Sequence, residues 1–122
     1  MQKNRRNVEE LRLALESYTE ASLWIASAKA AGIGEREEFA PFEIEKTKER
    51  LAEIRNFVIS LPNCKEKLLL YYRYIRGLSM ERTAELLGVS LRSSYRIRLR
   101  ALEFAARRYK VEAVTVKNRH IS

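Results

Sequence analysis

Three arginines recur at steps of four near the end of the stretch "GLSMERTAELLGVSLRSSYRIRLR" (77–100): Arg92, Arg96 and Arg100. At 3.6 residues per turn, this spacing places the three guanidinium groups on one stripe of a helix. A guanidinium group pairs bidentately with phosphate or with the edge of guanine. The stripe therefore predicts a surface that meets a polyanion. Arg98, which falls about 200° from Arg96 around the same helix, is expected to face the packed side and pair with Glu81 or Glu85.

The excess positive charge of the chain is concentrated in the same half. Of the net charge of +8, residues 1–60 contribute ten Lys/Arg against eleven Asp/Glu, and residues 61–122 contribute fourteen against five. Such asymmetry favours a nucleic-acid partner for the C-terminal half over a merely soluble basic surface.

Helix start and stop signals divide the C-terminal half into three helices. Four residues have capping or turn chemistry: Gly77, Ser79, Gly88 and Ser90. The helices that they delimit are predicted at residues 63–76, 79–87 and 90–109. A short helix, a three-residue turn with Gly and a long basic helix have the spacing of a helix-turn-helix, in which Ala84 lies at the helix crossing.

The segment "LP" (61–62) followed by "RYIRGLSMERTAELLGVS" (73–90) resembles region 4 of bacterial sigma factors. The positions that match the pattern of this family are Arg73, Tyr74, Gly77, Leu78, Ser79, Ala84, Glu85, Leu86, Leu87, Gly88 and Ser90. The resemblance covers about residues 61–108 and implies a DNA-binding helix-turn-helix. Thr83 and Ser94 depart from the apolar residues usual at their positions, and each buried hydroxyl needs a hydrogen-bond partner.

A helix that enters the major groove meets base edges with its N-terminal residues. We therefore expect four side chains of the long helix to read bases: Leu91, Arg92, Tyr95 and Arg96. Five polar side chains around the turn are expected to contact phosphate: Ser79, Arg82, Ser90, Ser93 and Arg100. Leu91 is suited to a thymine methyl group, and Arg96 to guanine.

The N-terminal half reads as an αα-hairpin, with helices predicted at about residues 6–31 and 40–60. Pro41 fits the first turn of the second helix. Apolar residues form a seam on each helix, and eight of them are candidates for oligomerisation: Leu11, Leu15, Tyr18, Ile25, Ile44, Leu51, Ile54 and Val58. The alternative is that these seams pack on the C-terminal domain. Trp24 is expected to anchor the hairpin.

The sequence contains few residues that could form a catalytic site. The single histidine, His120, lies in the tail, and the single cysteine, Cys64, has no histidine near it. We expect no catalytic residues, no metal site and no cofactor. No apolar run reaches the roughly 18–20 residues that span a bilayer. With one cysteine, this favours a cytoplasmic protein that does not enter the membrane.

The sequence thus predicts an all-α protein: an N-terminal αα-hairpin (1–61), a three-helix helix-turn-helix domain (62–110) and a flexible tail (111–122). Its architecture resembles small prophage transcriptional regulators of the ArpU-like group. The predicted function is sequence-specific binding of double-stranded DNA, with a homodimer through the hairpin or RNA polymerase as further partners. Two alternatives stay open: a DNA-packaging oligomer like a small terminase subunit, and a protein-interaction module that contacts RNA polymerase without reading DNA.

Overall fold

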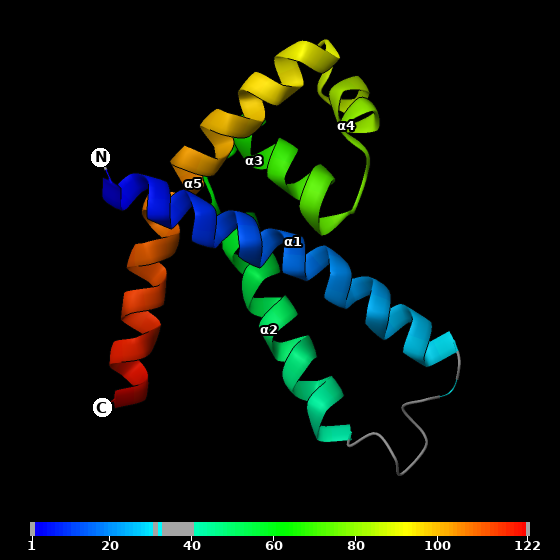
Figure 1. The fold of residues 1–122 in the computed structure, drawn as a ribbon, viewed down its shortest axis with the longest axis vertical. Helices are drawn as coiled ribbons and strands as arrows, with labels where there is room; N and C mark the ends of the chain where they lie inside the picture. The colour runs from blue at the N-terminus through cyan, green and yellow to red at the C-terminus, as the bar shows by residue number, and fades with distance from the viewer. Residues whose placement is uncertain (1, 31, 33–40, 122) are drawn as a thin grey trace.

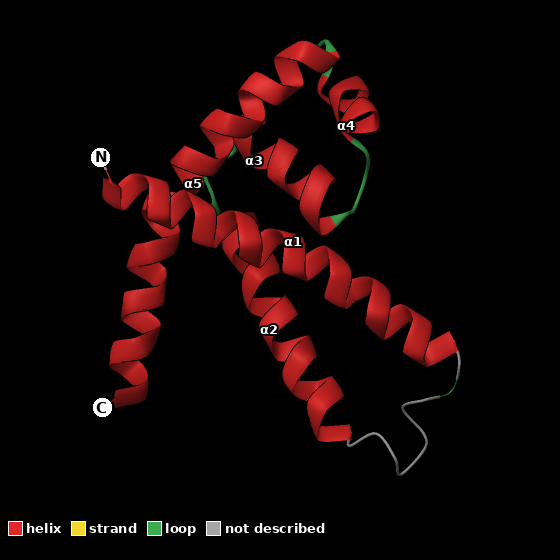
Figure 2. Ribbon diagram, in the orientation of Figure 1, coloured by secondary structure: helices red, strands yellow, loops and turns green. Residues whose placement is uncertain are grey.

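The computed structural model describes the backbone of residues 2–30, 32 and 41–121 and the side chains of residues 5–30, 32 and 45–109. These residues form helices and no strands, which confirms the all-α prediction (Figure 2). The elements are α1 (Gln2–Ala30), α2 (Pro41–Ser60), α3 (Lys65–Leu70), the π-helical turn η2 (Tyr71–Ile75), α4 (Met80–Leu87) and α5 (Leu91–Ile121).

The helices pack together around one central region. The connected ends of α1 and α2 project from it on one side, and the C-terminal turns of α5 project from it on another. α3 with η2, α4 and the first half of α5 form one lobe, and α1 lies across this lobe and contacts α5 and η2 (Figure 1). α2 packs against the first half of α1, but the two helices diverge toward the connection between them. The last turns of α5 extend beyond α1 on the other side.

One apolar core joins the two predicted domains. Leu15 of α1, Val58 of α2, Leu69 of α3 and Ala101 of α5 are each 0% exposed and belong to a single buried cluster. Burying a side chain of this size contributes about 1.5–3 kcal/mol to stability, so the shared cluster favours folding as one unit. Phe57 also meets a ring of α5 edge-on, at a centroid distance of 5.2 Å.

The seam residues proposed for oligomerisation pack inside the chain, which is the alternative that the sequence left open. Five of them lie in the buried core: Leu11, Leu15, Tyr18, Ile54 and Val58. Ile25 and Leu51 are half-buried, and the side chain of Ile44 lies outside the described residues. The oligomerisation assignment is therefore wrong for these five side chains, because the α1–α2 hairpin is short of apolar partners and takes them from α3 and α5. Trp24 was also misassigned as an anchor, because its side chain is 46% exposed.

The long C-terminal helix continues past its predicted end. α5 runs through Ile121, whereas the sequence predicted a helix to about residue 109 and a tail beyond it. The segment "KVEAVTVKNRHI" contains no Gly or Pro, and its β-branched residues lower helix propensity by only a fraction of a kcal/mol each. No signal in it stops a helix that has already formed.

Candidate nucleic-acid interface

Ser79 begins α4 as the sequence predicted. Its Oγ accepts a hydrogen bond from the backbone N–H of Arg82 at 3.1 Å, and its extended backbone lies outside the helix. This satisfies one of the donors that a helix start leaves unpaired. Thr83, which departs from the sigma-factor pattern, is fully buried, and its hydroxyl donates to the Ser79 carbonyl at 2.8 Å. The buried hydroxyl therefore has the partner that it requires.

Gly88 makes the turn between α4 and α5. Its φ of +70° lies in the left-handed region, where an L side chain is strained. The N–H of Gly88 donates to the Glu85 carbonyl at 3.1 Å, and that of Val89 to the Ala84 carbonyl at 3.0 Å. This pair of bonds is a Schellman motif, which closes α4 and redirects the chain into α5. Ala84 is 3% exposed, as expected for a residue at a helix crossing.

Ser90 begins α5 in the same way. Its Oγ accepts from the backbone N–H of Ser93 at 3.1 Å and donates to the Ser93 hydroxyl at 3.0 Å. Ser94, the second departure from the sigma-factor pattern, is fully buried and donates to the Leu91 carbonyl. Ser79 and Ser90, which were expected to contact phosphate, are thus the N-caps of α4 and α5.

The outer face of α5 carries the predicted base-reading side chains. Leu91, Arg92, Tyr95 and Arg96 are all exposed, and so is Arg100. The side chain of Leu99 is 63% exposed, and among the large apolar side chains of the described residues only Leu23 is more exposed. It lies seven residues after Arg92 and three after Arg96, on the same face. Sequence reasoning missed Leu99, although this spacing was available to find it.

A groove beside this face brings residues of two helices together. It has a volume of about 590 Å³, and its lining residues include Lys65, Ser93, Arg96, Leu99 and Arg100. Lys65 comes from the first turn of α3 and was not predicted as a site residue. Three cations that converge on one groove are the arrangement that phosphate contacts require.

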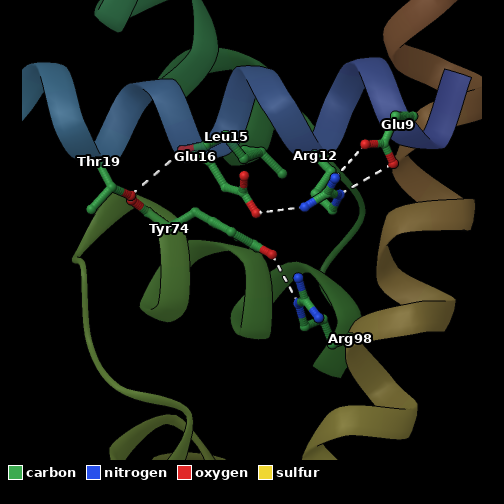
Figure 3. A network of polar contacts seen from close by, with 7 residues as sticks. All are labelled: Glu9, Arg12, Leu15, Glu16, Thr19, Tyr74 and Arg98. Carbon is green, nitrogen blue, oxygen red and sulfur yellow. Dashed lines mark hydrogen bonds and ion pairs between the residues drawn. The ribbon is translucent and has the colours of Figure 1, made fainter.

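Arg98 is held away from this face. Its Nε donates to the Tyr74 hydroxyl at 2.9 Å, which ties α5 to η2 (Figure 3). The prediction that Arg98 serves the structure agrees with this bond, but the proposed acidic partners were wrong. Glu85 instead pairs with Arg82 at 2.9 Å across one turn of α4. Because that pair is exposed, it holds the Arg82 side chain only weakly.

The π-helical turn that carries Tyr74 is fixed by α1. The Arg76 N–H donates to the Tyr71 carbonyl at 2.9 Å, five residues back. The Tyr74 carbonyl accepts instead from Thr19 Oγ1 of α1, at 2.8 Å (Figure 3). A side chain of the hairpin thus completes the hydrogen bonding of the helix that supports α5.

Nearer the N-terminus of α1, Arg12 forms ion pairs with two carboxylates of the same helix. It pairs with Glu9 and, at 3.0 Å, with Glu16. The hydrogen bond from Arg12 holds the pKa of the Glu9 carboxyl below its usual value, and in turn raises the pKa of the Arg12 guanidinium. Glu9 is exposed, whereas Arg12 and Glu16 are half-buried, and the two ion pairs support α1 at the spacing of one turn.

Within the residues that the structure describes, no group of three or more His, Cys, Asp and Glu side chains is placed to hold a metal ion. Cys64 is half-buried and its Sγ donates to the Pro62 carbonyl at 3.3 Å. Of the helices searched over the same residues, none is long and apolar enough to cross a membrane.

Comparison with protein-family models, with curated proteins and with solved structures finds no match to this chain. The functional assignment therefore depends on the geometry of the site.

Proposed function

We propose that the protein is a sequence-specific regulator of transcription that binds double-stranded DNA. The observation that carries this proposal is the pairing of a capped helix–Gly turn–helix with an exposed arginine stripe on the second helix. An α-helix with its side chains is about 10–12 Å across, which matches the roughly 12 Å width of the major groove. The second helix of such a motif is the one that reads base edges.

Four contiguous side chains form the proposed reading face of α5: Arg92, Tyr95, Arg96 and Leu99. Arg96 pairs with guanine, and the methyl groups of Leu99 contact a thymine methyl. Leu91 extends the face at the start of the helix. Glu103 is exposed one turn beyond Leu99. Its negative charge repels phosphate, so the proposed DNA-binding surface ends before this residue.

Phosphate contacts come from the cations beside the reading face. Lys65 of α3 and Arg100 of α5 line the same groove, so both contact one segment of the DNA backbone, from different sides. Arg82 joins them after leaving its exposed pair with Glu85. Ser79 and Ser90 cap α4 and α5, and the two helix starts present backbone N–H groups to phosphate. The Ser93 hydroxyl accepts a hydrogen bond from Ser90 beside the second of these helix starts.

We also propose a location and a partner. The protein acts in the cytoplasm, as a regulator of the prophage type, and contacts RNA polymerase or a second copy of itself while it is bound to DNA. Because the apolar seams of α1 and α2 are buried, a dimer that reads two half-sites uses other side chains.

Selection of duplexes from a random pool by the purified full-length chain tests this proposal. We expect one enriched sequence and a salt dependence of log K with a slope of roughly −3, as for about three phosphate contacts. Scrambled duplex of the same length is the control. Enrichment of no sequence, with equal affinity for both duplexes, would reject sequence-specific binding. Absence of salt-sensitive duplex binding would reject the DNA partner and favour the protein-interaction alternative.

A further inference from the structure

Two exposed leucines of α5 lie beside the arginines of the proposed reading face. The side chain of Leu91 is 41% exposed and that of Leu99 is 63% exposed. Eight residues of helix separate them by about 12 Å, so they contact different base pairs, which are stacked about 3.4 Å apart. A leucine side chain has no hydrogen-bond donor or acceptor. In the major groove it therefore recognises apolar surface alone, and the C5 methyl group of a pyrimidine provides that surface.

The arginines of this face are not engaged elsewhere in the chain. Among the described residues, no ion pair or side-chain hydrogen bond involves Arg92 or Arg96, whereas Arg98 donates to the Tyr74 hydroxyl. A guanidinium group only donates hydrogen bonds, and guanine offers it two acceptors, O6 and N7. Adenine offers one acceptor and an amino group that opposes a second N–H. The two free arginines are therefore suited to guanine.

The reading face has no side chain that is suited to adenine in the same way. Asn and Gln pair bidentately with adenine, because each carries both a donor and an acceptor. Residues 64–117 contain neither Asn nor Gln. The hydroxyl group of Tyr95 both donates and accepts, so it fits either purine. The face therefore combines recognition of guanine with recognition of a C5 methyl group.

A single base pair presents both features when 5-methylcytosine is paired with guanine. Among the four ordinary bases only thymine carries the C5 methyl group, and its partner is adenine. Methylation of cytosine at C5 adds the methyl group to the pyrimidine edge and leaves O6 and N7 of the guanine partner free. Leu99 and Arg96 are three residues apart and thus neighbours on the helix surface, so they are placed to meet the two halves of such a pair.

We propose that the reading face of α5 recognises 5-methylcytosine paired with guanine, so that methylation of cytosine in the DNA site strengthens binding. Leu91 and Leu99 contact the methyl groups, and Arg92 and Arg96 pair with guanine. This inference rests on the proposed function, because it specifies the duplex that this function binds. It adds a mode of regulation, in which the methylation state of the DNA controls occupancy of the site.

Selection by the full-length chain from two random pools of duplex DNA tests the inference. One pool contains cytosine, and the other contains 5-methylcytosine at every cytosine position. We expect the methylated pool to yield the tighter duplexes. Replacing one contacted 5-methylcytosine by cytosine should then weaken binding about fourfold, as for one buried methyl group. Replacing the whole pair by thymine and adenine keeps the methyl group but removes guanine, and should weaken binding at least about fivefold.

Three variants assign the effect to side chains. Leu99→Ala should cancel the effect of methylation at one cytosine and leave it at another. Leu23→Ala is the matched control, because Leu23 is 65% exposed on α1, outside the reading face, and it should keep the whole effect. Arg96→Gln gives the complementary test. Because Gln pairs with adenine, the preference at the contacted pair should pass from 5-methylcytosine and guanine to thymine and adenine.

The inference is overturned if duplexes of one sequence bind alike with cytosine and with 5-methylcytosine, or if Leu99→Ala keeps the whole effect of methylation. It is also overturned if the thymine–adenine replacement binds as tightly, because the methyl group alone would then be recognised. Sequence-specific binding without an effect of methylation would overturn this inference and leave the proposed function intact. Absence of duplex binding from both pools would overturn both.

Discussion

Arg98 and Tyr74 form a 2.9 Å hydrogen bond that separates one arginine of α5 from its neighbours. Arg96 and Arg100 lie two residues away on either side, yet both are exposed, while Arg98 is half-buried against η2. The bond is one of the contacts that hold the packed side of α5, together with the buried side chains of Ile97 and Ala101. Arg98 therefore belongs to the packed side of the helix and not to its outer face.

Tyr74→Phe removes this bond with little change of shape. A hydrogen bond to a charged group contributes about 1.5–3 kcal/mol, so we expect the free energy of unfolding in a urea titration to fall by about 1–2 kcal/mol. Because neither residue reaches the outer face, the ratio of affinities for selected and scrambled duplex should stay within about twofold. A large loss of this ratio at unchanged stability would mean that Arg98 contacts DNA.

Gly88 is expected to be costly to replace for reasons of backbone alone. A Cβ at this position would meet no atom within 4 Å, so the strain of a φ of +70° is the whole effect. Gly88→Ala should lower the free energy of unfolding by about 1–2 kcal/mol. Gly88→Asn is the matched control and should cost less, because Asn tolerates the left-handed region. Equal losses in thermal or urea unfolding would point to a different backbone conformation at the turn.

Leu99 is expected to contribute to specificity and not to stability. Leu99→Ala should change the free energy of unfolding by less than about 0.5 kcal/mol, because the side chain is 63% exposed. Replacing thymine by uracil removes only the methyl group. In a binding titration, one such replacement in the selected duplex should weaken the wild-type chain and leave Leu99→Ala unaffected.

Leu91→Ala provides the control for this experiment, because Leu91 lies two turns earlier on α5. It should cancel the effect of uracil at a different thymine. If the penalty at every thymine is the same in wild type and in Leu99→Ala, Leu99 does not contact a thymine methyl.

The turn chemistry was predictable because it is local. Ser79, Gly88 and Ser90 act on backbone groups within a few residues, so each residue type together with its position was sufficient. The hydroxyls of Thr83 and Ser94 also find partners within one turn. Each of the two buried hydroxyls thus has the partner that its burial requires.

The features that the sequence did not predict depend on contacts between distant segments. The π-helical turn at 71–75 is completed by Thr19, which lies 55 residues before Tyr74 in the chain. Arg98 likewise takes a partner 24 residues away, where helical spacing suggested an acidic residue of α4. Burial of the hairpin seams against α3 and α5 also required knowledge of how the helices pack.

The central claim is that Arg96 reads sequence while Arg100, one turn later, holds phosphate. The most direct test measures the affinity of wild type, Arg96→Ala and Arg100→Ala for the selected and the scrambled duplex at one salt concentration. We predict that Arg96→Ala loses about 1–3 kcal/mol of discrimination, whereas Arg100→Ala weakens both complexes alike and keeps the ratio. An unchanged ratio for Arg96→Ala would contradict the assignment of the reading face.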